Sequence, residues 1–437
     1  MKIHFIGIGG IGISGLAQYM HFKGHQVSGS DLNASLITKK LDAMGITITT
    51  PHSADAITDQ DLVIHSAIIR PDNPEVVRAK ELGIEVVARR EALLEILKDE
   101  KVFAVAGAHG KSTTTAILSA IMQGSAIIGA ESKEFGSNVR FNKTTDLMLF
   151  EADESDGSFL NSNPYCSIVI NAEPEHMEYY DYNTERFYDS YKRFINQAQL
   201  RVLNAQDPFL ATLKGEVDAL WLDPKKDISH INYILIDDEP YTEFELKDLG
   251  KFKVWGFGEH IALDASLAIL AANESMDIEH IRENILHFKG IKKRFDIVAK
   301  DTNCVIIDDY GHHPTEIKAT FDSVKTYAKL KGFEHITAIW QPHKYSRTLS
   351  NIDAFSNCFE GADELIVLPV WSAGEIYQDI DFQAMFKKYN FTLADKIHRV
   401  ENCVEIIRNN QVLSHAKNGL IISFGAGDIT YQIRGEK

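Results

Sequence analysis

Short apolar runs alternate with amphipathic segments through the first hundred residues. The apolar runs have the length of buried strands, and apolar residues keep helical spacing from Ile11 to about Lys23. Such alternation predicts a parallel sheet with helices on its faces. The predicted strands are Ile3–Ile8, Gln26–Asp31, Ile46–Thr50, Leu62–Ser66 and Glu85–Ala88.

The same alternation resumes twice, after a charged segment at 98–101 and after the basic run Lys292–Asp296. We therefore predict an α/β protein of three domains. The central domain (100–296) has a mainly parallel sheet and contains, at 102–121, a strand, a Gly-Ala-His-Gly-Lys-Ser turn and a helix, the order of a P-loop-type ATPase domain. A Rossmann-like N-terminal domain (1–99) precedes it, and a Rossmann-like C-terminal domain (297–437) follows it. Further predicted strands are Val102–Ala106, Asp146–Glu151, Ser167–Asn171, Tyr233–Ile236, Phe252–Trp255, Cys304–Asp309, Ile336–Trp340, Leu365–Leu368 and Leu420–Phe424, with helices beginning at His260 and Pro314.

The segment Gly107–Thr115 stands between a predicted strand and a predicted helix and ends in Lys-Ser-Thr-Thr-Thr. This order is typical of a phosphate-binding loop, in which glycines let backbone N–H groups surround phosphate oxygens. Lys111 would add a point charge, and the Ser112 hydroxyl could ligate Mg²⁺. Only Ala108 and His109 separate the glycines, where the general pattern has about four residues. A glycine-rich turn without a ligand is therefore the alternative.

A second glycine pattern, Gly7–Gly12, follows the first predicted strand, and Asp31 stands about 20 residues further on, as in a dinucleotide fingerprint. The pattern suggests NAD. The turn and its helix N-terminus, however, suit any diphosphate, and the acidic residue can accept a hydrogen bond from a hydroxyl of any nucleotide. A UDP-linked substrate would satisfy both, and a purely structural turn is the third interpretation.

Polar residues end two strands of the central domain. Glu151 follows four apolar residues, and His176 closes the segment that follows the next strand. Since the carboxyl ends of parallel strands meet at one edge of a sheet, both side chains are candidates for Mg²⁺ coordination, directly or through water. A solvated acidic turn is the alternative for Glu151, and an ordinary exposed histidine is the alternative for His176.

Four strand ends of the C-terminal domain carry polar loops rather than plain turns. We expect them to share one edge of the sheet and to line a cleft. The basic run Lys292–Asp296 before this domain is either exposed to solvent or placed to bind the negative charge of a triphosphate. The loops are 310–313, 341–347, 371–375 and 425–428.

The length, net charge and cysteine content of the chain limit the classes of function that we consider. The chain has 437 residues and a formal net charge of −17, which disfavours non-specific binding to nucleic acid or an anionic membrane. Its four cysteines are far apart, so no zinc site or disulfide framework is indicated. No signal peptide or membrane-length apolar run is evident. We expect a soluble cytoplasmic protein, monomer or homodimer.

Taken together, these segments resemble the Mur ligase family along essentially the whole chain. The most specific mark is Asp308–Glu316, and the short phosphate loop is the family's own form. The resemblance implies an ATP- and Mg²⁺-dependent ligase that joins L-alanine to the lactyl carboxylate of UDP-N-acetylmuramate through an acyl phosphate, in cytoplasmic peptidoglycan precursor synthesis. The other marks are Gly7–Gly12, Gly107–Thr115, Glu151–Asp156, Asn171–His176, Gln341–Arg347 and Gly425–Asp428.

The resemblance also implies four sets of site residues, and it places Arg294 against the nucleotide at the junction of the central and C-terminal domains. Lys111, Glu151, His176 and Arg294 would be catalytic. The sets are Gly107, Ala108, His109, Gly110, Lys111, Ser112, Thr113, His260 and Arg294 for ATP; Gly9, Gly10, Ile11, Gly12, Asp31 and Ser66 for the UDP substrate; Tyr310, His312, Lys344 and Arg347 for the amino acid; and Ser112, Glu151 and His176 for the metal.

Two departures from the family pattern bear on these sets. Ile261 and Asp264 stand where the family has asparagines that contact adenine, and Lys344 stands where arginine is common. A point charge there replaces a bidentate fork, so recognition of the amino-acid carboxylate would be looser.

Three other functions stay open at this stage. A sister Mur ligase would add another amino acid or a preformed peptide. A nicotinamide-dependent oxidoreductase would explain the first glycine turn and leave Gly107–Thr115 unexplained. A non-catalytic nucleotide-sugar sensor would bind ATP without turnover.

Overall fold

The structure is a computed structural model that describes residues 1–436. The chain forms two compact units. Unit 1 comprises Met1–Ile231, Glu243–Val254 and Glu259–Lys289, and unit 2 comprises Asn232–Thr242, Trp255–Gly258 and Gly290–Lys437. Three mainly parallel sheets confirm the predicted α/β class: two lie in unit 1 and one in unit 2. The boundaries at 99 and 296 stay predictions.

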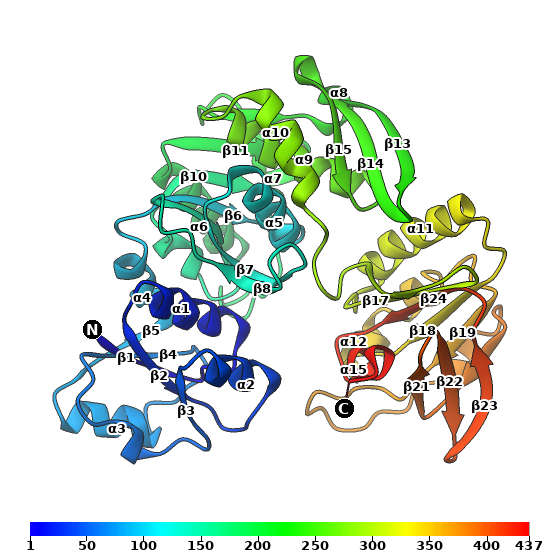
Figure 1. Cartoon of the computed structure of the whole chain (residues 1–437), viewed down its shortest axis with the longest axis horizontal. Coiled ribbons are helices and arrows are strands. Elements are labelled where there is room, and N and C mark those ends of the chain that lie inside the picture. Colours follow the sequence, from blue (N-terminus) through cyan, green and yellow to red (C-terminus); the bar gives the residue numbers. More distant parts are fainter. Residues whose placement is uncertain (437) are drawn as a thin grey trace. The chain divides into compact units, whose positions relative to one another are not determined.

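The first sheet of unit 1 has the order β3-β2-β1-β4-β5, and every strand pair is parallel. Helices α1 and α4 cover one face and α3 the other (Figure 1). Side chains alternate between the two faces: Phe5 and Ile64 join the core under α1, whereas Ile6 and Val63 join the core under α3. The elements are β1 (Lys2–Ile6), α1 (Ile11–Phe22), β2 (Gln26–Ser30), α2 (Leu36–Ala43), β3 (Thr47–Thr49), β4 (Leu62–His65), α3 (Pro74–Glu81), β5 (Glu85–Ala88) and α4 (Arg89–Ile96).

The second sheet of unit 1 has the order β12-β11-β10-β6-β9-β7-β8, and only β8 runs antiparallel to its neighbour. Strand β6, which precedes the predicted phosphate loop, lies between β10 and β9. The elements are β6 (Lys101–Ala106), α5 (Lys111–Met122), β7 (Ser125–Ser132), β8 (Ser137–Arg140), β9 (Leu147–Glu151), β10 (Pro164–Val169), α6 (Thr184–Gln197), β11 (Leu200–Asn204), α7 (Pro208–Thr212), β12 (Leu220–Leu222), α8 (Pro224–Asp227), α9 (Glu259–Asn273) and α10 (Ile278–Asn284). A separate three-stranded sheet consists of β13 (Ile228–Ile236), β14 (Glu239–Leu246) and β15 (Gly250–Trp255).

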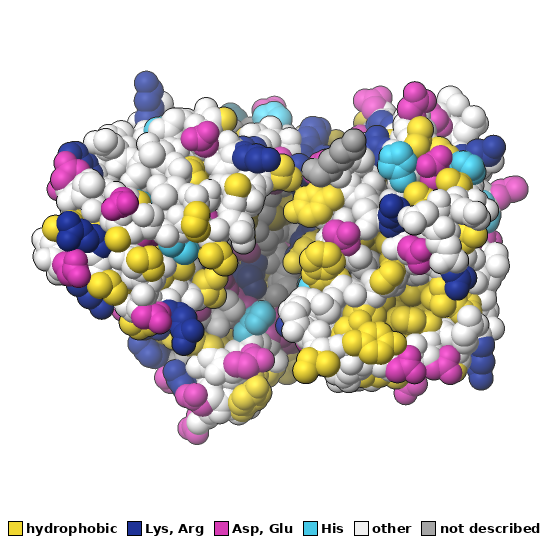
Figure 2. Space-filling view, turned by 90° about the horizontal axis from the view of Figure 1, so that it is seen from below, with side chains coloured by type: hydrophobic (Ala, Val, Ile, Leu, Met, Phe, Trp, Pro, Cys, Tyr) yellow, Lys and Arg dark blue, Asp and Glu magenta, His cyan; other side chains and the backbone are white. Residues whose placement is uncertain are grey.

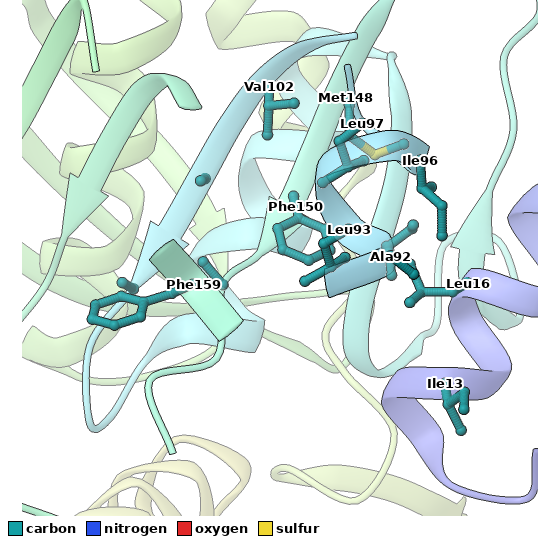
Figure 3. Packing of buried hydrophobic residues seen from close by; sticks show 14 of the residues in the cluster. Ile13, Leu16, Ala92, Leu93, Ile96, Leu97, Val102, Met148, Phe150 and Phe159 are labelled. Carbon is teal, nitrogen blue, oxygen red and sulfur yellow. The ribbon is translucent and has the colours of Figure 1, made fainter. Parts of the chain in front are cut away.

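One hydrophobic core joins the two sheets of unit 1. Leu93 of α4 lies between Leu16 of α1 and Phe150 of β9 (Figure 3), and all three belong to the same buried cluster. Residues on both sides of position 99 therefore pack together. The segment 98–101 is predicted to be a domain junction only because it is charged. Its charge does not show how the residues before and after it pack.

The sheet of unit 2 has the order β16-β17-β24-β18-β19-β20, with β16 antiparallel and the other pairs parallel. A second, antiparallel sheet consists of β21, β22 and β23. The elements are β16 (Asp296–Lys300), β17 (Cys304–Asp309), α11 (Pro314–Lys331), β18 (Ile336–Trp340), α12 (Tyr345–Ser350), α13 (Ile352–Phe355), β19 (Glu364–Val367), α14 (Phe382–Met385), β20 (Phe391–Leu393), β21 (Lys396–Val400), β22 (Cys403–Arg408), β23 (Gln411–Ala416), β24 (Gly419–Phe424) and α15 (Ile429–Arg434).

The surface carries charges of both signs, and the cysteines are unpaired. On the face seen in Figure 2, Lys and Arg side chains are interspersed with Asp and Glu. All four cysteines are free thiols, and Cys166, Cys304 and Cys358 are buried. Across residues 1–436, no helix combines the length and the apolar character that a bilayer crossing requires.

Candidate functional site

The glycine turn after β1 is packed closely at Gly7 and Gly9, where a side chain would have no room. The Gly9 N–H donates to Asp31 Oδ2 at 2.8 Å. A Cβ at Gly9 would lie 2.7 Å from that oxygen, and a Cβ at Gly7, where φ is +78°, would lie 2.7 Å from Ser66 Oγ. The turn, Asp31 and Ser66 thus meet at the carboxyl edge of three neighbouring strands, as predicted.

Arg89, which no sequence pattern singled out, packs against the same turn. A Cβ at Gly12 would lie 2.6 Å from Arg89 Nη1. The guanidinium donates to Asp156 Oδ2 at 2.8 Å and to Ser158 Oγ at 3.2 Å. Burial alone would raise the pKa of Asp156, but Arg89 and Ser158 bring it below its usual value. Arg89 is the first residue of α4, where a positive charge interacts unfavourably with the helix dipole. This unfavourable position is the sequence signal that could have identified Arg89 as a site residue.

The phosphate loop joins β6 to α5 and is braced from the neighbouring strand β10. The His109 N–H donates to Asn171 Oδ1 at 3.1 Å, and Asn171 Nδ2 donates to the His109 carbonyl at 3.2 Å. Gly110 has φ +84°, and a Cβ there would lie 2.8 Å from Asp264 Oδ1. His260, exposed in the first turn of α9, precedes Asp264 by about one turn. The first turns of α9 therefore lie beside the loop.

Lys111 is the cation of this loop, and its Nζ has three acceptors. It donates to the Gly107 carbonyl at 2.6 Å, to the Ala108 carbonyl at 3.3 Å and to Glu154 Oε1 at 2.9 Å. The Glu154 side chain is only 1% exposed. Burial raises its pKa, and the Lys111 charge opposes that rise. An acidic residue three positions beyond Glu151 thus holds the lysine at the loop.

Glu151 ends β9 beside the loop, as predicted. Its Oε1 accepts from Ser112 Oγ at 3.0 Å, and its Oε2 accepts from the Gly129 N–H at 2.6 Å. Burial raises the pKa of Glu151, which the hydrogen bond from Gly129 and the charge of Lys111 oppose. Within residues 1–436, no group of three or more His, Cys, Asp and Glu side chains is arranged to hold a metal ion.

A cavity of about 1170 Å³ in unit 1 is lined by the Gly7–Gly12 turn and by Lys111, the one residue of the phosphate loop that reaches it among those described. It lies where the first sheet and the central sheet share their core. All six residues predicted for the UDP substrate line it, together with three of those predicted to be catalytic. These lining residues are Gly9, Gly10, Ile11, Gly12, Asp31, Ser66, Lys111, Glu151 and His176, to which Arg89 and Glu154 are added.

In unit 2, the four polar loops follow β17, β24, β18 and β19, which are neighbours in the sheet. They therefore lie at one carboxyl edge, as predicted. Tyr310 and His312 stand in the first loop with ring centroids 5.3 Å apart, and His312 lies 5.7 Å from the ring of His343 in another. Burial lowers the pKa of His312, which favours the neutral form of its imidazole.

Arg347 and Lys344 stand at the start of α12, next to His343. Arg347 Nη1 donates to His343 Nδ1 at 2.9 Å. Burial, followed by the charge of Arg347, lowers the pKa of His343 to about 4, so the ring is a neutral acceptor. Lys344 has φ +71°, which is uncommon for a residue with a side chain. His343 lies inside one of the segments that carry the family resemblance but was not predicted as a site residue.

Arg294 also belongs to unit 2 and lies near the loop that follows β17. Burial raises the pKa of Asp309 to about 6, and the charge of Arg294 is among the influences that oppose the rise. The same charge helps His312 to hold the pKa of Glu316 below its usual value. Arg294 thus stands within electrostatic reach of the residues predicted for the amino-acid site.

Comparison with known proteins assigns this fold and these loops to one class. The family model described as "Mur ligase family, catalytic domain" matches residues 2–101, and "Mur ligase, glutamate ligase domain" matches residues 293–427. The chain belongs to the Mur ligase family.

Within that family, the chain is similar over its whole length to several proteins named UDP-N-acetylmuramate–L-alanine ligase. A UDP-N-acetylmuramate–L-alanine ligase of Campylobacter curvus is 53% identical over 434 residues, 99% of each chain. One of Helicobacter pylori (strain P12) is 56% identical over 438 residues, 100% of this chain and 96% of that one. The crystal structure of a UDP-N-acetylmuramate–alanine ligase of Thermotoga maritima matches with a TM-score of 0.82 at 28% identity, over 99% of this chain and 97% of that one.

Proposed function

We propose that this protein is an ATP-dependent ligase that joins L-alanine to the lactyl carboxylate of UDP-N-acetylmuramate in peptidoglycan precursor synthesis. Relatives of that name match the chain over its whole length. The observation that carries the proposal is the cavity in unit 1, because Lys111 and the Gly9–Gly12 turn line it together. A nucleotide sugar and a phosphoryl donor bound there would be within reach of each other.

The roles proposed for the site residues are those that the family resemblance implies. The UDP group would bind on Gly9, Gly10, Ile11 and Gly12, with Asp31 and Ser66 beside it. ATP phosphates would bind on Gly107–Thr113, with His260 near the base and Arg294 supplying charge to the transferred phosphoryl group. Tyr310, His312, Lys344 and Arg347 would hold L-alanine, and the contact of Arg347 with neutral His343 supports an ordered guanidinium there.

The oxygens of Ser112 and Glu151 fit a hard divalent cation. They lie 3.0 Å apart at the phosphate loop, and Mg²⁺ prefers hydroxyl and carboxylate oxygens with phosphate completing its shell. We propose that Ser112 and Glu151 hold one Mg²⁺ and that His176 lies near a second, directly or through water. When bound, Mg²⁺ would neutralise phosphate charge, and the raised pKa of Glu151 would fall because the cation favours the carboxylate.

The chemistry has two steps. A lactyl carboxylate oxygen attacks the γ-phosphorus of ATP, the bond to the β-phosphate oxygen breaks, and ADP leaves. Lys111 and Arg294 would offset the charge that develops on the transferred group. The amine of L-alanine then attacks the acyl carbon, and phosphate leaves with the former carboxylate oxygen.

The amine must lose a proton before it attacks, and His176 and His312 are the candidate bases. His312 lies beside Tyr310 among the residues proposed for the amino-acid site, whereas His176 lines the cavity of unit 1. Small-molecule substrates are the proposed partners, with no nucleic acid and no membrane. A cytoplasmic location and a monomeric or homodimeric state stay predictions.

Isotope transfer tests the proposed route directly. UDP-N-acetylmuramate labelled with ¹⁸O in its lactyl carboxylate is turned over with ATP and L-alanine, and the released phosphate is analysed by mass spectrometry. The proposal requires one labelled oxygen in phosphate for each amide formed. Unlabelled phosphate accompanying amide formation would contradict an acyl phosphate.

A further inference from the structure

Arg294 is carried by a short loop of unit 2 whose backbone is strained on both sides of it. Lys293 has φ +66° and Phe295 has φ +43°, and neither is glycine. The Arg294 N–H donates to the Ile291 carbonyl at 3.2 Å, which closes the turn. Residues with side chains adopt such angles only where the surroundings impose them.

Two buried carboxylates impose this conformation. The Lys293 N–H donates to Asp296 Oδ2 at 3.1 Å, and the Phe295 N–H donates to Asp309 Oδ2 at 2.8 Å. Both aspartates are 4% exposed. The residues on either side of Arg294 are therefore each tied to a carboxylate that has almost no contact with water.

Arg434, in the last helix α15, links one of these carboxylates to the sheet. Its Nε donates to Asp308 Oδ2 at 2.7 Å, and its Nη2 donates to Asp296 Oδ2. The Arg434 side chain is 9% exposed and Asp308 is fully buried. Thr430, also in α15, donates to the same Asp308 oxygen at 2.7 Å. One planar guanidinium thus bridges two buried carboxylates and fixes their positions relative to each other.

We propose that Arg434 is a positioning residue for Arg294, acting through Asp296 and the strained loop, and that the C-terminal helix is therefore part of the catalytic apparatus. The proposal rests on the proposed action of Arg294 on the transferred phosphoryl group. Without the Arg434 guanidinium, the Asp296 carboxylate would be free to turn, and its hydrogen bond to the Lys293 N–H would be lost or weakened. The loop would then relax to ordinary backbone angles, and Arg294 would lose its fixed direction, which costs turnover rather than substrate binding.

A purely structural Arg434 would tie α15 to the sheet and have no special relation to Arg294. A double-mutant cycle separates the two roles, because residues that act through one another are not additive. Arg434→Gln, Arg294→Ala and the double variant of the full chain are assayed for alanine-dependent phosphate release with all three substrates. Arg399→Gln is the matched control, since Arg399 contacts the Arg434 carbonyl but neither aspartate.

The expected result is a kcat about tenfold lower for Arg434→Gln, with KM for UDP-N-acetylmuramate unchanged and Arg399→Gln like the wild type. In the Arg294→Ala background, Arg434→Gln should lower kcat less than twofold further. Independent, multiplicative losses would overturn the inference and leave the proposed function intact. Wild-type turnover in Arg294→Ala would instead remove the proposed role of Arg294.

Arg434→Lys keeps the inference testable if the glutamine variant unfolds below the assay temperature. A lysine retains the charge but cannot bridge two carboxylates as a planar fork does. It should recover part of the kcat that glutamine loses and show the same dependence on Arg294. A lysine variant that is fully active, or whose loss is independent of Arg294, would contradict a positioning role.

Discussion

At the scale of single residues, the ion pair of Lys111 and Glu154 serves both folding and the proposed chemistry. One partner is nearly fully buried, and the pair is 2.9 Å long. Removing one member of such a pair leaves a buried charge without its partner, which costs more than the pair contributes. Loss of activity in a Lys111 variant would therefore be ambiguous unless stability is restored separately.

Lys111→Met should lower the free energy of unfolding by about 2–3 kcal/mol, because Glu154 then loses its cation. Adding Glu154→Gln should recover most of that stability, since the amide carries no charge. Phosphate release should stay abolished in both variants. Denaturant unfolding and the coupled assay check this prediction. Activity returning together with stability in the double variant would exclude a direct role for Lys111.

His343 makes stability depend on pH. Its pKa is about 4 in the folded protein, against about 6.5 for an unperturbed imidazole. Well above pH 6.5 the ring is neutral in both the folded and the unfolded protein, so His343 does not change the free energy of unfolding there. As the pH falls from 6.5 to 4, the unfolded chain binds a proton that the folded ring refuses, so stability decreases.

The loss across this window should be about 1–2 kcal/mol from His343 alone, below the full linkage value because the ring is partly exposed. Urea unfolding at pH 7 and pH 4.5 should show that His343→Gln loses correspondingly less stability than the wild type. Asp309 acts in the opposite direction, since its pKa is raised by burial to about 6. The test is therefore the difference between His343→Gln and the wild type in how the free energy of unfolding changes with pH. The pH dependence of the wild type alone combines both groups. An equal pH dependence in both would contradict a titrating His343.

The residues that could be predicted are those whose role follows from position along a local pattern. Asp31, Glu151 and Tyr310 each stand at or directly after the last residue of a strand. The topology of a parallel sheet places such residues at its carboxyl edge. Arg434 and His343 could not be selected in this way. Arg434 contacts Asp308 across 126 positions of sequence, and the importance of His343 depends on Arg347 and His312 packing around it.

At the scale of elements, the turn between β6 and α5 depends on glycine for two separate reasons. Gly110 has φ +84°, and it faces Asp264. Gly136 is the matched control, because it also has positive φ, +63°, but a Cβ there would meet no atom within 4 Å. The two sites separate backbone strain from steric overlap.

Gly136→Ala should cost about 1–2 kcal/mol of stability, the strain of a left-handed residue, and leave ATP binding unchanged. Gly110→Ala should cost more and weaken ATP binding at least tenfold, because the loop must shift to admit the new Cβ. Thermal unfolding and calorimetric titration with ATP check both variants. Wild-type ATP affinity in Gly110→Ala would contradict the assignment of this loop.

Element bounds were predictable where an apolar run is sharply bordered. Strands β17 and β18 begin and end at the predicted residues. Strand β10 begins at Pro164, three residues before its predicted start, and ends at Val169, because its pairing with β6 includes a register shift near the proline. The hydrophobic pattern predicts which residues are buried. The first and last residues of a strand depend instead on its hydrogen bonds with the neighbouring strand.

At the scale of the whole molecule, the two sheets of unit 1 share one hydrophobic core (Figure 3). One cavity of this unit is lined by both the Gly7–Gly12 turn and Lys111. No local pattern predicts this arrangement, because it depends on α1 and α4 packing against the central sheet. The alternation of strands and helices predicted three domains, and the structure adds the side chains that join the first two sheets.

UDP-N-acetylmuramate should stabilise the protein against heat, by about 2.7 kcal/mol at one hundred times its dissociation constant. Asp31→Ala should weaken this effect, since Asp31 orders the glycine turn. Differential scanning fluorimetry with the nucleotide sugar, with ATP and with NAD measures it. Stabilisation by NAD instead of the nucleotide sugar would favour an oxidoreductase.

The central claim is that ATP is consumed only to join an acid and an amine. Phosphate release measured with ATP, UDP-N-acetylmuramate and L-alanine together, and with each omitted in turn, tests it most directly. The account predicts sustained release only in the complete mixture and the greatest rate with L-alanine among amino acids. Equal phosphate release without L-alanine, or none in the complete mixture, would contradict it.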